Sequence, residues 1–270
     1  MPELPEVETT RRGIEPHLLG HTIAGAIVRN PRLRWPVPED LDAKVHGQQI
    51  LQVRRRAKYL IIDLESGFLL LHLGMSGNLR VVPANTPLRP HDHVDLLLDD
   101  GFVLRLHDPR RFGALLWYPA GSEPALLANI GPEPLSPAFD GAYLAARARG
   151  KQQAVKQFIM DAQVVAGVGN IYANEALYRA GVDPARAAGR ISGTRYARLA
   201  QAIKTVLQEA IEAGGTTLRD FSAPSGKPGY FVLSLQVYGR EGEPCAHCGN
   251  AIRQTRIGQR STFHCPKCQT

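Results

Sequence analysis

The chain begins Met1-Pro2-Glu3, and the proline at position 2 is the first residue whose type suggests chemistry. Initiator methionine is commonly removed before a small residue, and its removal would give Pro2 a free secondary amine. When unprotonated, such an amine can attack C1′ of a sugar and form an iminium ion. A chain-terminal amine has a pKa of about 7.7–8, so it needs less perturbation than a lysine. Glu3 could donate or shuttle the proton; the plain alternative is an ordinary helix start.

A second candidate site lies near the C-terminus, where two Cys-x2-Cys pairs are separated by 16 residues. Each pair can offer two thiolates to one ion from a tight turn, and four thiolates close a tetrahedral zinc site without an open catalytic position. A reactive dithiol is the competing interpretation, and His247 or His264 could replace one thiol. We predict one structural Zn²⁺ per chain, held by Cys245, Cys248, Cys265 and Cys268.

The charge balance is basic, with 32 Lys and Arg against 25 Asp and Glu and a formal net charge of +7. Basic proteins favour polyanions because each neutralised phosphate releases counterions, although a basic surface without a ligand gives the same total. The distribution favours a polyanion, since basic residues cluster at 54–58, at 110–111 and on the predicted zinc hairpin as Arg253, Arg256 and Arg260. A solvated face or a protein–protein module remains the alternative for that hairpin.

Targeting signals are not evident in the sequence. No apolar run approaches the roughly 20 residues that span a bilayer, and the N-terminus has neither the basic nor the apolar region of a signal peptide. All four cysteines lie in the last 26 residues, which leaves none for disulfides elsewhere and fits a reducing compartment. We expect a cytoplasmic, nucleoid-associated bacterial enzyme without membrane contact.

The elements that must position these residues change type along the chain. A helix is predicted from Pro5 to about Leu19, because proline suits a first helical turn and Glu6 and Glu8 complement the helix dipole. Repeated short apolar runs between turn residues are typical of a β-sandwich. They predict strands at 50–53, 59–64, 68–73, 79–82, 94–98, 102–106 and 114–118.

The second half of the chain has helical periodicity. Residues 119–137 are rich in proline and glycine, as linkers are. Apolar residues then recur at helical spacing and predict helices at 152–161, 170–180 and 195–213, the last one ended by Gly214-Gly215. A loop is predicted at residues 216–230. The fold class expected is α+β, with a sandwich at 1–130, a linker at 131–150, a helical domain at 151–235 and a zinc finger at 236–270.

Several motifs together resemble a known family, the bacterial formamidopyrimidine-DNA glycosylases, which remove oxidised purines such as 8-oxoguanine and ring-opened guanine. The resemblance runs from end to end, with no motif residue missing. Its motifs are PELPEVE at 2–8, RRAKY at 55–59, HLGMSG at 72–77, HDHVD at 91–95, DPRRFG at 108–113, GVGNIY at 167–172 and the zinc finger. It implies a catalytic N-terminal helix on the sandwich, a helix–two-turn–helix motif in the helical domain and a β-hairpin zinc ribbon.

The resemblance also implies roles for individual residues. Pro2 would be the nucleophile that forms a Schiff base, and Glu3 the acid. Lys58 would assist β-elimination, and Arg260 would hold the phosphate and aid δ-elimination. Asn170 would begin a helix whose N–H groups and dipole favour a phosphate. Further DNA contacts are implied for His91, Arg110, Lys151 and Lys156.

Enzymes that act on a base inside a duplex must extrude it, which costs roughly a few kcal/mol of unstacking. The resemblance implies that Met75 and Phe112 fill the resulting gap while Arg110 hydrogen-bonds the unpaired cytosine. Without the resemblance, core packing is the simpler interpretation of each. The loop at 216–230, with Thr216, Thr217 and Tyr230, would close over the damaged base.

The resulting hypothesis is a monomeric, bifunctional DNA glycosylase and AP lyase of base excision repair, acting on damaged double-stranded DNA. Two alternatives stay open. The sister family, endonuclease VIII, removes oxidised pyrimidines by the same chemistry, although Leu4 to Glu8 and the Met75 and Phe112 pair resemble the purine branch. A non-catalytic zinc-ribbon DNA-binding protein would share the basic charge but form no covalent intermediate.

Overall fold

The computed structural model describes residues 2–215 and 234–270, which form two compact units. Among the described residues, the first unit contains 2–128 and 213–215, and the second combines Asn129–Glu212 with residues 234–270. The expectations for Thr216, Thr217 and Tyr230 lie outside the described residues.

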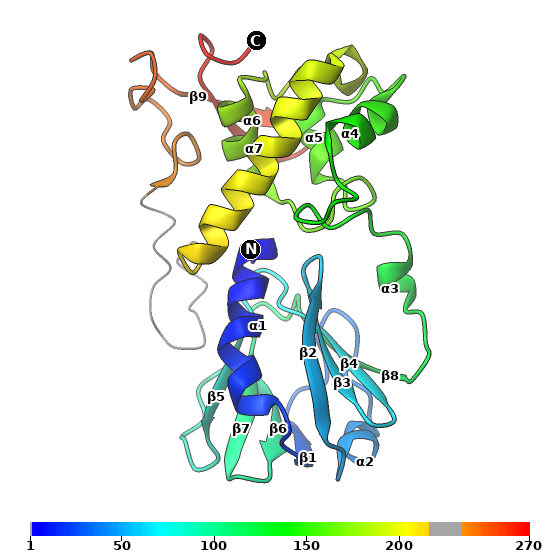
Figure 1. Ribbon diagram of the computed structural model, residues 1–270. Helices are drawn as coiled ribbons and strands as arrows, with labels where there is room; N and C mark the ends of the chain where they lie inside the picture. The colour runs from blue at the N-terminus through cyan, green and yellow to red at the C-terminus, as the bar shows by residue number, and fades with distance from the viewer. Residues whose placement is uncertain (1, 216–233) are drawn as a thin grey trace. The chain divides into compact units, whose positions relative to one another are not determined.

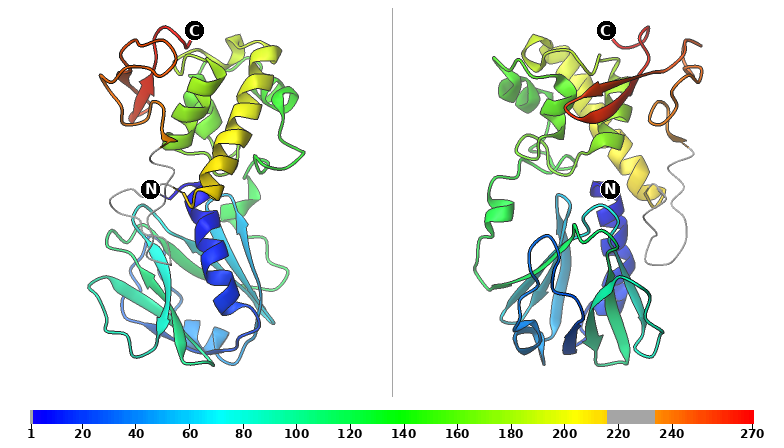
Figure 2. Two further views of the ribbon diagram at one scale, coloured as in Figure 1. Left: turned by 60° about the vertical axis from the view of Figure 1, so that its left-hand side comes forward. Right: turned by 180° about the vertical axis from the view of Figure 1, so that it is seen from behind.

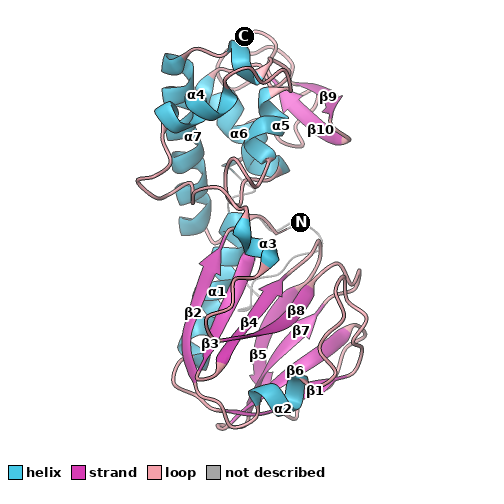
Figure 3. Ribbon diagram, turned by 90° about the vertical axis from the view of Figure 1, so that its right-hand side faces the viewer, coloured by secondary structure: helices cyan, strands magenta, loops and turns pink. Residues whose placement is uncertain are grey.

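The first unit contains two antiparallel four-stranded sheets, the two layers of strands in Figure 3. One sheet has the order β1 (Ile23–Val28), β6 (Asp92–Leu98), β7 (Phe102–His107) and β5 (Asn78–Pro83). The other has the order β2 (Ile50–Arg56), β3 (Tyr59–Leu64), β4 (Gly67–His72) and β8 (Ala114–Pro119). The inward faces of both sheets contribute to one apolar core, as the sandwich prediction requires.

Helix α1 (Leu4–Leu18) lies beside β2 and β5, which are end strands of the two sheets (Figure 1). Its Val7, Ile14 and Leu18 are buried in the sandwich core. The short helix α2 (Leu41–Val45) packs against β1, another end strand. Because α1 and α2 cover these edge strands, the unpaired backbone groups at the sheet edges are protected. The contact also fixes the N-terminal residues on α1 to a rigid support.

The second unit contains helices α4 (Gly141–Ala148), α5 (Val155–Met160), α6 (Asn170–Ala180) and α7 (Gly193–Glu212), together with the short 3-10 helix η1 (Ala188–Arg190). Helix α7 packs against α4 and α6, and its apolar stripe is buried as predicted. A hairpin of β9 (Arg253–Ile257) and β10 (Arg260–His264) lies against α6 (Figure 2). Among the described residues, no helix is long and apolar enough to cross a membrane.

The structure differs from the sequence expectations at the start of one helix and in several elements that were not expected. The helix expected at 152–161 begins only at Val155, because Ala154 instead forms an isolated bridge with Ala187. Strand β1, helix α2 and the short helix α3 (Ala125–Ala128) were not expected. Helix α4 lies inside residues 131–150, which were expected to be a linker, and packs on α7. The domain boundaries themselves stay a prediction.

Candidate active site and zinc centre

The first candidate residues, Pro2 and Glu3, are buried at the start of α1. A capping box holds them: the Glu3 carboxylate accepts the backbone N–H of Glu6, and the Glu6 carboxylate accepts the backbone N–H of Glu3 at 2.9 Å. This reciprocal pair satisfies two N–H groups that a helix start otherwise leaves without partners. The nitrogen of Pro2 therefore lies next to a backbone segment that the two hydrogen bonds of the capping box hold in place. While Met1 is attached, that nitrogen is an amide and cannot act as a nucleophile.

Lys58 lies in the two-residue turn between β2 and β3, with Ala57 in the left-handed region at φ 52°. Arg55 supports this turn by donating to the carbonyl of Ala57 at 2.9 Å. Its guanidinium also pairs with Glu8 of α1 at 3.2 Å. The Arg55–Glu8 pair connects the Lys58 turn to α1, which Pro2 and Glu3 directly precede. Contacts within the first unit therefore link these three predicted catalytic residues.

Glu8 is the acidic partner of three arginines, since Arg11 and Arg12 also contact its carboxylate, at 3.0 and 2.9 Å. Burial alone would raise the pKa of Glu8, but the hydrogen bonds from Arg11 and Arg12 and the charge of Arg55 lower it below its ordinary value. Glu8 therefore stays ionised near neutral pH and acts as a fixed anchor rather than a proton donor.

The predicted gap-filling residues, Met75, Arg110 and Phe112, lie on two loops of the first unit, and His91, a predicted DNA contact, lies on a third loop. Met75 is half-buried, whereas His91, Arg110 and Phe112 are exposed, the Phe112 residue by 45%. The Arg110 guanidinium lies 5.0 Å from the centre of the Phe112 ring, a cation–π contact. An exposed phenylalanine beside arginine does not match the core-packing alternative for Phe112.

The second unit carries the remaining predicted DNA contacts. Asn170 begins α6 after the extended Gly169, so the positive end of the helix dipole lies there. Its side-chain amide donates to the carbonyl of Ser261 on β10 at 3.1 Å. Lys151 is exposed. Arg260 is exposed and directly follows the tight turn of Gly258 and Gln259, both at positive φ as a type I′ hairpin requires.

Lys156 is placed differently from its expected position along a phosphate track. It is only 1% exposed, and its ammonium donates to the carbonyl of Ser261 at 2.7 Å and to the hydroxyl of Thr262 at 2.8 Å. A buried charge needs such partners to offset the loss of hydration. Lys156 thus faces the zinc hairpin, next to the strand that begins with Arg260, rather than solvent.

The four cysteines lie together, with all four sulfur atoms within 4.8 Å of one another. The Sγ atoms of Cys245 and Cys268 are 3.9 Å apart, and those of Cys248 and Cys265 are 3.4 Å apart. A tetrahedral zinc ion with Zn–S bonds of about 2.3 Å requires sulfur separations of roughly 3.8 Å. The donor set therefore fits one Zn²⁺, and among the described residues neither His247 nor His264 belongs to the cluster.

A tyrosine that sequence reasoning missed supports this centre. The hydroxyl of Tyr178 on α6 lies 3.1 Å from the Cys245 sulfur. Burial alone would raise the pKa of the Cys245 thiol, but hydrogen bonds from Tyr178 and from backbone N–H groups lower it below its ordinary value, which favours the thiolate.

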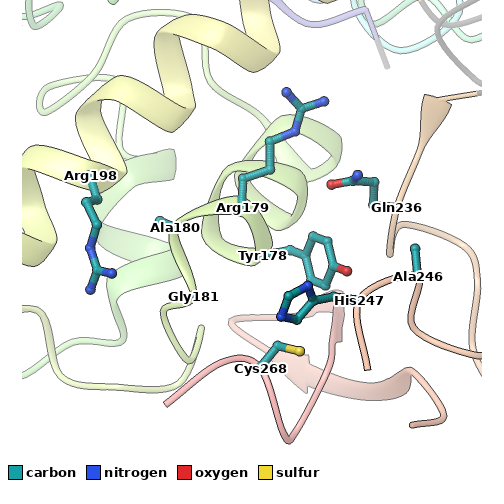
Figure 4. Close-up of a pocket in the computed structure, with 9 residues that line it drawn as sticks. All are labelled: Tyr178, Arg179, Ala180, Gly181, Arg198, Gln236, Ala246, His247 and Cys268. Carbon is teal, nitrogen blue, oxygen red and sulfur yellow. The ribbon is translucent and has the colours of Figure 1, made fainter. Parts of the chain in front are cut away.

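An open pocket of about 460 Å³ lies beside the centre (Figure 4), where the labelled side chains of Tyr178, His247 and Cys268 lie close together.

Two more side chains of α6 were also missed. Asn174 accepts the backbone N–H of Phe263 on β10 at 2.8 Å. The buried Glu175 accepts three successive backbone N–H groups, from Gln236, Val237 and Tyr238, at 2.9 to 3.0 Å. Both residues lie just after the GVGN segment at 167–170, but nothing in a local pattern indicates partners more than 60 residues away.

Comparisons with known proteins agree with this architecture over almost the whole chain. The N-terminal domain of formamidopyrimidine-DNA glycosylase matches residues 1–115, its H2TH domain matches 130–222, and the zinc finger found in FPG and IleRS matches 242–270. The fold and site thus define a DNA glycosylase with a helix–two-turn–helix domain and a zinc finger.

Whole-chain relatives narrow the assignment. Formamidopyrimidine-DNA glycosylases of Acidithiobacillus ferrooxidans and Syntrophotalea carbinolica are 59% and 60% identical, with 100% of each chain covered. The crystal structure of the MutM (Fpg) protein from Thermus thermophilus has a TM-score of 0.89 at 41% identity, covering 99% of this chain and 98% of that one. The Lactococcus lactis Fpg in complex with abasic-site DNA has a TM-score of 0.92 at 32% identity, covering 100% of both. The chain belongs to the formamidopyrimidine-DNA glycosylase family.

Proposed function

We propose that this chain is a bifunctional DNA glycosylase and AP lyase that excises oxidised purines, namely 8-oxoguanine and formamidopyrimidines, from double-stranded DNA. The observation that carries the proposal is the capped N-terminus of α1, which holds Pro2 beside Glu3 and is tied through Glu8 and Arg55 to the Lys58 turn. Structures of a family member bound to Fapy-dG DNA and to abasic-site DNA support the substrate class.

The first chemical step follows from the Pro2 amine, once Met1 has been removed. The nitrogen lone pair forms a bond to C1′ while the glycosidic bond breaks. The electron pair of the glycosidic bond leaves with the oxidised base. Glu3 handles the protons that this exchange requires, one lost from the proline nitrogen and one gained at the sugar. The sugar ring then opens: the C1′–O4′ bond breaks, its electron pair stays on O4′, which takes up the proton, and the nitrogen lone pair completes an iminium ion between Pro2 and C1′.

The iminium then acidifies the hydrogens at C2′. Loss of one of these hydrogens expels the 3′ phosphate by β-elimination. Lys58, on a turn that Arg55 fixes, would assist this step. A second elimination expels the 5′ phosphate, with Arg260 on the zinc hairpin as its phosphate partner. Asn170 at the start of α6, together with Lys151, His91 and Arg110, would position the DNA backbone.

Zinc would have a structural role and would not take part in the reaction. Four cysteine thiolates would hold the ion and leave no open position, so it would stabilise the hairpin that presents Arg260. Met75, Arg110 and Phe112 would occupy the gap left by the extruded base. The chain would act as a monomer.

Borohydride trapping on duplex DNA that contains 8-oxoguanine opposite cytosine tests the proposal. The expected result is a covalent enzyme–DNA adduct that maps to Pro2 of the processed chain and is absent when an uncleaved N-terminal extension keeps the Pro2 nitrogen as an amide. A protein that binds the duplex tightly without any adduct would instead be the non-catalytic zinc-ribbon protein. Faster excision of thymine glycol than of 8-oxoguanine would favour the endonuclease VIII alternative.

A further inference from the structure

We propose that Asp108 is a positioning residue that joins the loops carrying Met75, His91 and Phe112 into one rigid surface for filling the gap in the duplex. This inference rests on the proposed function, because the gap exists only if a base is extruded. Asp108 itself is fully buried, so it acts through its neighbours rather than on DNA.

The carboxylate of Asp108 connects two of these loops. Its Oδ2 accepts the backbone N–H of Gly113 at 2.8 Å, which closes the loop that carries Arg110 and Phe112. Its Oδ1 lies 3.5 Å from the hydroxyl of Ser76, the residue next to Met75. One side chain therefore links the residue after Phe112 with the residue after Met75.

The backbone of Asp108 connects the third loop. Its N–H donates to the carbonyl of His91 at 3.0 Å, and its carbonyl oxygen lies 2.8 Å from Nε2 of His93. His91 has a positive φ of 73°, a conformation that residues other than glycine rarely adopt without support. The bond to Asp108 holds His91 in that conformation, with its side chain exposed.

Close backbone packing completes the block. Gly74, at φ 62°, lies so near the neighbouring loop that a β-carbon there would be 2.5 Å from the nitrogen of Gly113 and from the carbonyl carbon of Phe112. The N–H of Gly74 donates to Nδ1 of His72 at 2.9 Å. Thus the Met75 turn cannot move away from the Phe112 loop without breaking the contacts that Asp108 also uses.

Rigidity of this block has a direct consequence for base extrusion. Side chains that replace a base must hold their stacking geometry, and ordering mobile loops at the moment of binding would cost free energy. The Asp108 carboxylate removes that cost for the Met75 and Phe112 loops by fixing them in advance, and the backbone of Asp108 holds the His91 loop, a contact that side-chain substitutions leave in place. We therefore expect its loss to slow base excision, where the gap must be filled around an extruded base, more than lyase action on an abasic site, where no base must be unstacked.

The decisive comparison is between Asp108→Ala and Asp108→Asn. Asparagine keeps the geometry, because its oxygen can accept from Gly113 and its amide can donate to the Ser76 hydroxyl. Single-turnover excision of 8-oxoguanine opposite cytosine should fall about tenfold or more in D108A, equivalent to about 1.4 kcal/mol, and stay within about threefold in D108N. Cleavage of a preformed abasic site should change by less than about threefold in both.

Asp95→Asn is the matched control, because Asp95 is another buried carboxylate of the same unit and its ion pairs are with Arg29 and Arg105, neither of which lies on the three loops. It should destabilise the fold without changing the ratio of excision to lyase rates. D108A that excises like the wild type, or D108N that is as slow as D108A, would overturn the inference.

If D108A does not fold, Ser76→Ala serves instead, since it removes only the Oδ1 contact. It should lower excision relative to lyase activity, and an unchanged ratio would refute the positioning role. A wild-type enzyme without excision or trapping would refute the proposed function itself. An active wild type whose Asp108 and Ser76 variants keep its ratio would refute only the present inference.

Discussion

The side-chain oxygen of Asn174 accepts a hydrogen bond from the backbone N–H of Phe263 at 2.8 Å, across 89 residues of sequence. Asn170 and Lys156 reach the same strand through the carbonyl of Ser261, at 3.1 and 2.7 Å. Three side chains from α5 and α6 thus orient β10, the strand that begins with Arg260. The zinc ion alone could hold the hairpin together, but it would not fix the hairpin's direction relative to these helices.

Lys156→Met tests this docking. The substitution keeps the apolar stem but removes charge-assisted hydrogen bonds to Ser261 and Thr262, each of which contributes about 1.5–3 kcal/mol. We expect a lower midpoint of thermal unfolding and a larger loss of δ-elimination than of base excision, because Arg260 would lose its support. Lys151→Met is the control for stability: its side chain is exposed, so the midpoint should hardly change. Equal midpoints for the two variants would contradict the docking role of Lys156.

Removal of zinc should act on the hairpin first. Metal analysis should find about one zinc per chain, as expected for a four-cysteine site. After chelation, the core around Cys245, Cys265 and Phe263 should loosen, whereas the sandwich core, which contains no cysteine, should persist. Circular dichroism would then retain the sheet signal while affinity for duplex DNA falls. A metal-free protein that is fully folded and binds DNA normally would contradict the structural role of zinc.

Local patterns in the sequence predicted the elements with strong periodicity. The helix at 170–180 matches α6, and the cysteine spacing predicted the four-sulfur cluster. Strand β1 was missed because Ala24, Gly25 and Ala26 interrupt its apolar run. Helix α4 was missed because it lies in a stretch whose proline and glycine content suggested a linker.

The site was less predictable than the fold because its supporting contacts join distant segments. The resemblance to a family assigned roles to Pro2 and Arg260, but no spacing in the sequence pairs Glu8 with Arg55 or Asp108 with Ser76. Burial is a property of the whole fold, so the enclosed position of Lys156 could not be read from a basic residue at the start of a helix. Such contacts become visible only once the chain is folded.

Gly74→Ala tests the close approach of two loops. A methyl group at this position would meet the backbone of Phe112 and Gly113 at 2.5 Å, so one loop must move in addition to the strain at φ 62°. Gly101→Ala is the matched control, with φ 83° but nothing within 4 Å of the added carbon. We expect G101A to cost about 1–2 kcal/mol from backbone strain alone, and G74A to cost clearly more. Urea unfolding of both variants gives the two costs, and similar values would show that the loops can separate freely.

His72 should make stability depend on pH in the acid range. Loss of hydration lowers the pKa of His72 to about 4, with smaller contributions from the positive charges of Lys58 and Arg34. The neutral ring accepts the N–H of Gly74 and contacts Tyr59, with ring centres 4.9 Å apart. Because the folded pKa lies below that of the unfolded chain, about 6.5, this contribution is complete above that pH and is lost as the pH falls towards 4.

The variant His72→Gln isolates this effect, since an amide oxygen can accept the Gly74 N–H but does not titrate. Urea unfolding of both proteins between about pH 7 and pH 4.5 should show the wild type losing up to about 2.5 kcal/mol more than the variant, less where water reaches the half-buried ring. Other groups titrate in both proteins, so only the difference between the two curves reports on His72. Parallel curves would mean that His72 is protonated as easily in the folded protein as in the unfolded chain, and the neutral acceptor for Gly74 would then be the wrong description of this turn.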